Sequence, residues 1–131
     1  MISSPTLEFR SAAFPVTLEE EQETTTGISG MALSDWVSAQ LRAKGYAVGD
    51  VIPRDVGWCV PVESRPHTLY VTCAGTDDEK DGWRIHVHIE GGLLTRLFRK
   101  DQRREEVAGV FAALKQSLQA AAVTEMREVS A

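Results

Sequence analysis

The chain carries a His-x-His pair, His86 and His88, in a segment that alternates apolar and polar residues. Side chains on a strand alternate between its two faces, so both imidazoles are expected on one face. This spacing occurs in metal-binding strands, and Glu63 or Glu90 is a candidate third ligand. A metal site also needs supporting hydrogen bonds around its ligands. We interpret the histidines as part of a solvated polar face with nothing bound, with a metal or small-ligand site at His86, His88 and Glu63 as the alternative.

The two cysteines, Cys59 and Cys73, are predicted to be free thiols. The register that keeps the apolar residues together places Trp58 opposite Cys73 and turns Cys59 to the other face. Free thiols suit a reducing compartment. Cys59 as a nucleophile is a weaker hypothesis, resting on a predicted cationic neighbour, Arg84. Because no phosphate-binding loop, nucleophile elbow or dinucleotide fingerprint occurs, we expect no catalytic residues and no cofactor.

A basic segment stands out in a chain whose formal net charge is −5. Aromatic and arginine side chains dominate many protein interfaces, which favours this segment as a protein-binding surface. The alternative is a solvated helix entry, the usual meaning of a charge run. The acidic run 19–23 could pair with the basic segment of a second copy and form a homodimer. The predicted protein-binding residues are Arg96, Phe98, Arg99, Lys100 and Arg103.

Residues 57–90 predict the sheet that positions these groups. Three alternating segments are separated by turn-rich gaps, which is typical of an antiparallel meander. One face collects apolar side chains, and the other collects polar ones, including both histidines. If the second and third segments pair with Val71 opposite Ile85, then Tyr70 lies beside His86. The residues expected on the buried face are Trp58, Val60, Val62, Leu69, Val71, Cys73, Ile85, Val87 and Ile89.

Two helices are expected to cover that face. Apolar residues recur at helical spacing over 31–44, with Gly45 as the stop, and again after Asp101, a candidate N-cap. A strand over 7–18 precedes them, with a mobile acidic loop at 19–30 and a frayed tail at 124–131. The prediction is an α+β fold of order β-α-β-β-β-α, with three to four antiparallel strands and two helices packed on one face. The leading core candidates are Trp36, Trp58, Trp83, Phe111 and Leu114.

Length and composition set the broad class. A chain of 131 residues predicts a single domain, 1–131, with a core of its own. The hydrophobic and charged fractions, 43% and 25%, are those of an ordinary globular protein. No apolar run is long enough to span a bilayer, and no secretory signal is recognisable, so we expect a cytoplasmic protein. The negative net charge argues against a nucleic-acid partner.

A longer pattern resembles a family of small bacterial proteins of unassigned function. It comprises a helix followed by Gly45, an acidic-x-Gly-Trp turn at 55–58, and a strand ending in Cys73 and Gly75. The resemblance runs roughly from Phe9 to Glu90, and Val56 stands where an aromatic residue is expected. It implies a bacterial origin and an α+β domain, and it attaches no chemistry to these residues.

Together these patterns predict a non-catalytic protein-interaction module with an inhibitor, immunity-type or adaptor role. The partner is expected to contact the exposed sheet face or the basic segment near Phe98. A metal- or small-ligand-binding domain that uses the polar sheet face is the alternative function.

Overall fold

The computed structural model describes residues 2–14, 29–64, 67–76, 81–89, 100–121 and 123–129. Within these residues the chain forms two helices and eight strands. The helices are α2 (Met31–Ala43) and α3 (Lys100–Ala120). The strands are β1 (Ile2–Ser3), β2 (Thr6–Arg10), β3 (Ala47–Val48), β4 (Ile52–Arg54), β5 (Gly57–Ser64), β6 (His67–Gly75), β7 (Gly82–Ile89) and β8 (Thr124–Val129).

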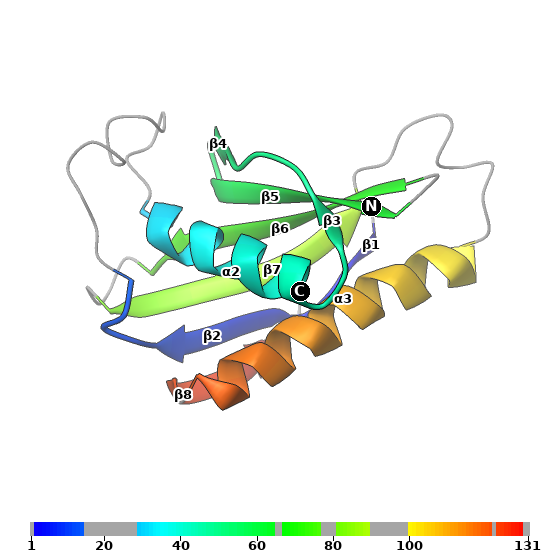
Figure 1. Ribbon diagram of the computed structural model, residues 1–131. Coiled ribbons are helices and arrows are strands. Elements are labelled where there is room, and N and C mark those ends of the chain that lie inside the picture. The colour runs from blue at the N-terminus through cyan, green and yellow to red at the C-terminus, as the bar shows by residue number, and fades with distance from the viewer. Residues whose placement is uncertain are drawn as a thin grey trace.

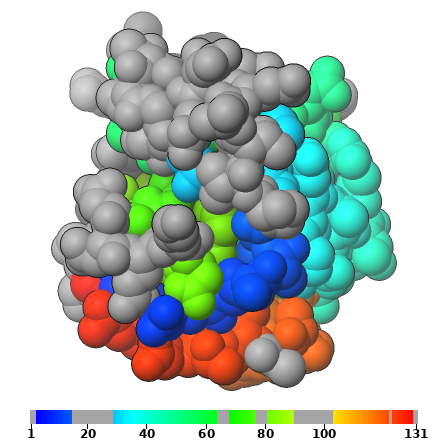
Figure 2. Space-filling view, turned by 90° about the vertical axis from the view of Figure 1, so that its left-hand side faces the viewer, coloured from blue at the N-terminus to red at the C-terminus, as the bar shows by residue number. Residues whose placement is uncertain are grey.

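The strands form one antiparallel sheet in the order β3-β5-β6-β7-β2-β8, with β1 beside β7 and β4 beside β5. Both helices pack on the same face of this sheet, which makes a two-layer α+β fold (Figure 1). Figure 2 shows the layers end-on, with α2 to the right of the strands. The predicted class and helix placement are confirmed, but the predicted three to four strands were too few. Of the four additional strands, β1, β3 and β4 have only two or three residues, too few to show an alternating pattern, and β8 lies in the segment expected to fray.

The meander has the predicted faces but only part of the predicted register. Val60 pairs with Val71 in β5 and β6, as expected. Between β6 and β7, however, Val71 pairs with Val87, whereas we expected Ile85. A slip of two residues leaves every side chain on its original face, so the apolar pattern cannot distinguish the two registers. Tyr70 therefore lies opposite His88, and Thr72 lies opposite His86.

The core lies between the sheet and the helices. All nine residues predicted on the buried face of the meander are buried. Of the leading core candidates, Trp58, Trp83 and Leu114 are buried, whereas Trp36 and Phe111 are partly buried at its margin. Phe14 fills the space between two of the indoles, with ring centroids 5.7 Å from Trp36 and 5.9 Å from Trp83. Such edge-to-face contacts add to the stabilisation from burial.

Helix α2 ends where the sequence predicted. Its C-cap is Lys44, and Gly45 follows with φ of 94°, a conformation that favours glycine. Helix α3 begins at Lys100, one residue before the predicted N-cap Asp101. Neither helix in the described part of the chain is long and apolar enough to cross a membrane.

The two ends of the chain differ from the prediction. The first strand, expected over 7–18, ends at Arg10, and it lies between β7 and β8 rather than at an edge. Residues 124–129, expected to fray, form the edge strand β8. This segment pairs with β2 and makes two further contacts. Lys115 of α3 donates a hydrogen bond to Glu128 at 2.8 Å, and Met126 packs against the core. Most of the acidic loop predicted at 19–30 lies outside the described residues.

Three glycines allow the backbone to pack closely at the end of β6. A Cβ atom on either Gly30 or Gly57 would lie 2.6 Å from the carbonyl oxygen of Cys73. Both glycines have positive φ, 146° and 143°, and Gly75 donates its N–H to the carbonyl of Ser29. The Gly-Trp turn and the Cys-x-Gly strand end are therefore explained by packing, because they bring α2, β5 and β6 together.

We expect Gly57→Ala to lower the free energy of unfolding by about 3 kcal/mol, from backbone strain and the clash with Cys73. Gly45→Ala is the matched control, since Gly45 also has positive φ but has nothing within 4 Å of its Cβ position. Its expected cost is about 1 kcal/mol. Urea unfolding of both variants measures the difference, and equal costs would contradict the packing argument.

Candidate functional site on the outer sheet face

The face of the sheet opposite α2 and α3, called here the outer face, carries the polar side chains of β5, β6 and β7. Among the described residues, neither helix lies on this face (Figure 1). Tyr70, Arg84 and His86 are half-buried there, and Thr68 and Glu63 are exposed. The sequence predicted that both histidines belong to this face, and they do.

Four side chains form a ladder of planar groups across the outer face. The guanidinium carbon of Arg54 lies 4.6 Å from the centroid of the Tyr70 ring. Tyr70 stacks on His88 with centroids 5.8 Å apart, and His88 stacks on His86 at 5.2 Å. The predicted register placed Tyr70 beside His86. The observed register instead places Tyr70 beside His88, so the ladder extends over three strands.

The ladder makes His88 less exposed than predicted. His88 stacks between Tyr70 and His86 and is 6% exposed as a residue, whereas an open polar face was expected for both histidines. Ser3 of β1 lies opposite His88 on its other side. The prediction that His88 is solvated was therefore wrong: it is buried, with rings on two sides and β1 and β6 flanking its strand.

The electrostatic environment of His86 opposes its protonation. Burial lowers the pKa of His86, and the neighbouring His88 and Arg84 lower it further. Burial penalises the imidazolium form, and the positive potential of Arg84 adds to that penalty. At neutral pH this ring is a neutral hydrogen-bonding group at the end of the ladder.

The cysteines lie apart from solvent. Cys59 and Cys73 are both free and fully buried, as the free-thiol prediction required. The Cys59 sulfur lies 3.4 Å from the Thr72 hydroxyl, and the next residue in this row is His86, not Arg84 as the sequence-based register suggested. Burial raises the pKa of Cys73, and the nearby Cys59 raises it further. A reactive thiolate needs solvent access, so neither sulfur is placed for nucleophilic attack.

The alternative metal site would need a third ligand next to the two histidines. His86 and His88 stack on each other, with ring centroids 5.2 Å apart and planes inclined by 29°. Glu63 pairs with Thr68, in a different row from either histidine. In the part of the chain that the structure describes, no group of three potential ligand side chains is close enough to hold an ion.

The basic segment is mostly outside the described residues. Arg96, Phe98 and Arg99 are among the residues that the structure does not describe, and Lys100 is described only as the first residue of α3. Arg103 is half-buried in the first turns of α3. This segment as a protein-binding surface therefore stays a prediction.

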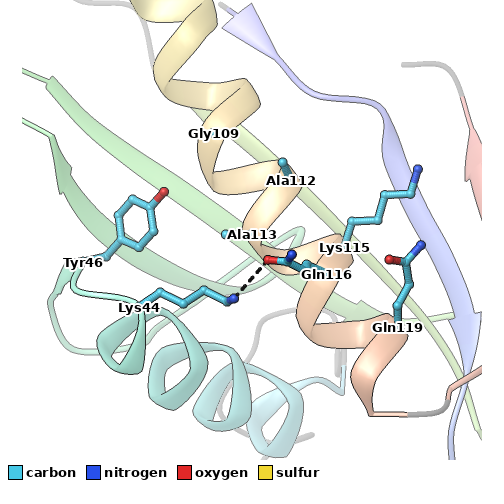
Figure 3. A pocket seen from close by; sticks show the side chains of 8 residues that line it. All are labelled: Lys44, Tyr46, Gly109, Ala112, Ala113, Lys115, Gln116 and Gln119. Carbon is cyan, nitrogen blue, oxygen red and sulfur yellow. Dashed lines mark hydrogen bonds between the residues drawn. The ribbon is translucent and has the colours of Figure 1, made fainter.

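A groove lies on the helical side of the molecule. It is open, has a volume of about 630 Å³, and lies between the end of α2 and the C-terminal half of α3 (Figure 3). Its lysines already contact other side chains: Lys44 donates to Gln116 at 3.4 Å, and Lys115 donates to Glu128 at 2.8 Å. Tyr46 lies at its wall, near Gly109. The groove has no cluster of stacked or titratable groups comparable to the outer face.

Sequence analysis did not identify Arg54 as part of the site. It belongs to β4, which pairs with β5 through a two-residue turn, Asp55-Val56. This hairpin carries the guanidinium to Tyr70, about 16 positions away along the chain and two strands across. The Asp-x-Gly turn at 55–57 was the only signal for the hairpin, and it gave no information on what Arg54 contacts.

We expect the stability of the protein to fall below about pH 6.5 partly through His86. In the unfolded chain the ring takes up a proton near its ordinary pKa of 6.5, whereas the native pKa is lower. The unfolded state therefore binds more protons as the pH falls, which reduces the free energy of unfolding. His86→Gln should lose part of this decrease in urea titrations at neutral and mildly acidic pH. If the free energy of unfolding changes with pH in the same way in both proteins, the lowered native pKa of His86 is contradicted.

We expect an excess of zinc to leave the melting temperature unchanged, because no third potential ligand lies with the two histidines among the described residues. Thermal unfolding with and without zinc measures this directly. A metal-dependent rise that disappears in the His86→Ala, His88→Ala double variant would instead support the alternative metal site.

Comparison of the chain with protein-family models, curated proteins and solved structures finds no match. The resemblance to a bacterial family, and the bacterial origin that it implies, stay predictions.

Proposed function

We propose that this protein is a non-catalytic protein-interaction module that binds its partner over the outer sheet face. Inhibitor, immunity-type and adaptor roles all require such a surface and no reactive centre. The observation that carries the proposal is the ladder of Arg54, Tyr70, His88 and His86, which spans three strands on the face opposite the helices.

The composition of this surface supports binding to a protein. Tyrosine and arginine are enriched among the residues that contribute most to interface energies. The Tyr70 ring is held between Arg54 and His88, so it loses little conformational entropy when a partner covers it. A preorganised aromatic group of this kind is a favourable anchor.

The β4–β5 hairpin adds apolar area next to the ladder. Ile52 is 40% exposed and Val56 is 58% exposed, and both belong to the hairpin that carries Arg54. Single exposed aliphatic residues are common on protein surfaces. Here they adjoin an aromatic and cationic anchor, which is the composition of an interface centre.

The burial of both thiols supports a function without covalent chemistry. The basic segment at 96–103 is the second candidate surface, as the sequence predicted, and the experiment below compares the two.

We expect Tyr70→Ala to abolish recovery of a specific partner from the native cell by the immobilised protein. The reason is that the substitution removes the central ring of the ladder and leaves Arg54 without its aromatic contact. The matched control is Tyr46→Ala, which removes the same type of side chain from the helical side of the molecule. Recovered proteins are identified by mass spectrometry, and circular dichroism checks that both variants are folded.

A charge-reversed Arg99→Glu, Arg103→Glu variant separates the two surfaces. If Tyr70→Ala is the only variant that fails to recover the partner, the outer face is supported as the binding surface. Loss only in the charge-reversed variant assigns binding to the basic segment and overturns the proposed surface. If all variants recover the partner equally, both surfaces are excluded as the binding site.

A further inference from the structure

Acidic and basic side chains pair with each other at the β8 side of the outer face, whereas the charged groups that act on His86 are basic. At the β8 side, Glu8 accepts hydrogen bonds from Arg127 at 2.6 and 3.0 Å, and Arg10 contacts Asp81 at 2.9 Å. These pairs neutralise each other locally. Closer to the ladder, Arg84 lies beside His86 on β7, opposite Glu8, whose carboxylate is engaged by Arg127.

The groups that face His86 come from several strands. On its own strand they are Arg84 and His88. Thr72 lies opposite on β6, with Cys59 behind it on β5. Other described groups on this face are Tyr70 of β6, Arg54 of β4, Ser3 of β1, the exposed Glu63 of β5, and the Glu8–Arg127 pair of β2 and β8. Among the described residues, the charged groups that act most strongly on His86 are His88 and Arg84, and both are basic.

A partner carboxylate placed beside His86 would make the local electrostatic potential favour protonation of this ring. An opposite charge within about 4–6 Å favours the imidazolium form of histidine, and it also pairs with the guanidinium of Arg84. The partner would thus supply a countercharge beside His86, where the described part of the chain places the basic groups Arg84 and His88.

Building on the proposed protein-binding function, we propose that the segment bound on the outer face is acidic, and that its binding is coupled to protonation of His86. The partner chemistry is a protein segment with exposed aspartate or glutamate side chains. Carboxylates contact Arg84 and the protonated imidazole, while Tyr70 provides the apolar contact. Binding then strengthens as the pH falls from about 7.5 to about 5.5, a range in which carboxylates stay ionised.

The size of the effect follows from proton linkage. If one proton is taken up on binding, affinity increases by at most about tenfold for each unit of pH. The increase ends below the pKa that His86 has in the free protein, because the ring is then already protonated.

The test uses a synthetic peptide of alternating glutamate and glycine, a control peptide with glutamine in place of glutamate, and inorganic phosphate. Histidine ring resonances are followed by NMR as a function of pH, after assignment with His86→Gln and His88→Gln. We expect the glutamate peptide to raise the pKa of His86, and the glutamine peptide to leave it unchanged. Arg84→Gln should weaken peptide binding at least severalfold, whereas Arg104→Gln, an equal change of charge on the exposed surface of α3, should not.

Three results would overturn the inference: an unchanged His86 titration with the glutamate peptide, a shift with phosphate alone, or equal weakening by the two arginine variants. Equal weakening by Arg84→Gln and Arg104→Gln would indicate that the acidic ligand binds at the basic segment instead. These outcomes are distinct from failure of the proposed function. A partner that depends on Tyr70 but binds equally at all pH values would keep the protein interface and eliminate its coupling to His86.

Discussion

The structure depends on burial of the aliphatic face of β5, β6 and β7 beneath α2 and α3. Side chains such as Val60, Val71 and Val87 are fully buried there, and this burial is the main favourable contribution to folding. Because strand side chains alternate, the same constraint turns the intervening residues to the outer face. The core and the candidate site are two sides of one sheet, and the position of one determines the position of the other.

The ladder on the outer face follows from the strand register rather than from residue types alone. Tyr70 and His88 are direct neighbours because Val71 pairs with Val87. In a register shifted by two residues, Tyr70 would lie next to His86, and the order of rings would change. Arg54 joins the ladder because the β4–β5 hairpin carries it to Tyr70. Register and hairpin together create a preorganised surface, which is why we assign the binding function to this face.

The most distinctive sequence motifs have structural explanations. Gly30 and Gly57 leave room for the carbonyl group of Cys73, and the N–H of Gly75 donates to the carbonyl of Ser29, two residues before α2. These contacts align the N-terminus of α2 with the ends of β5 and β6. The motifs therefore describe how the two layers join, whereas the proposed function rests on less distinctive polar residues outside these motifs.

The sequence by itself determined the α+β class, the boundaries of α2, the β5–β6 register and the face on which each residue of the meander lies. Periodicity records which side of an element is buried, and burial depends on each residue's own hydrophobicity. Only the tertiary structure decided the β6–β7 register, the pairing of residues 124–129 with β2, and the contact between Arg54 and Tyr70. These features depend on which strands pair with each other and in which register. Two-residue slips keep the same burial pattern, so the choice is made by contacts between residues distant in the chain.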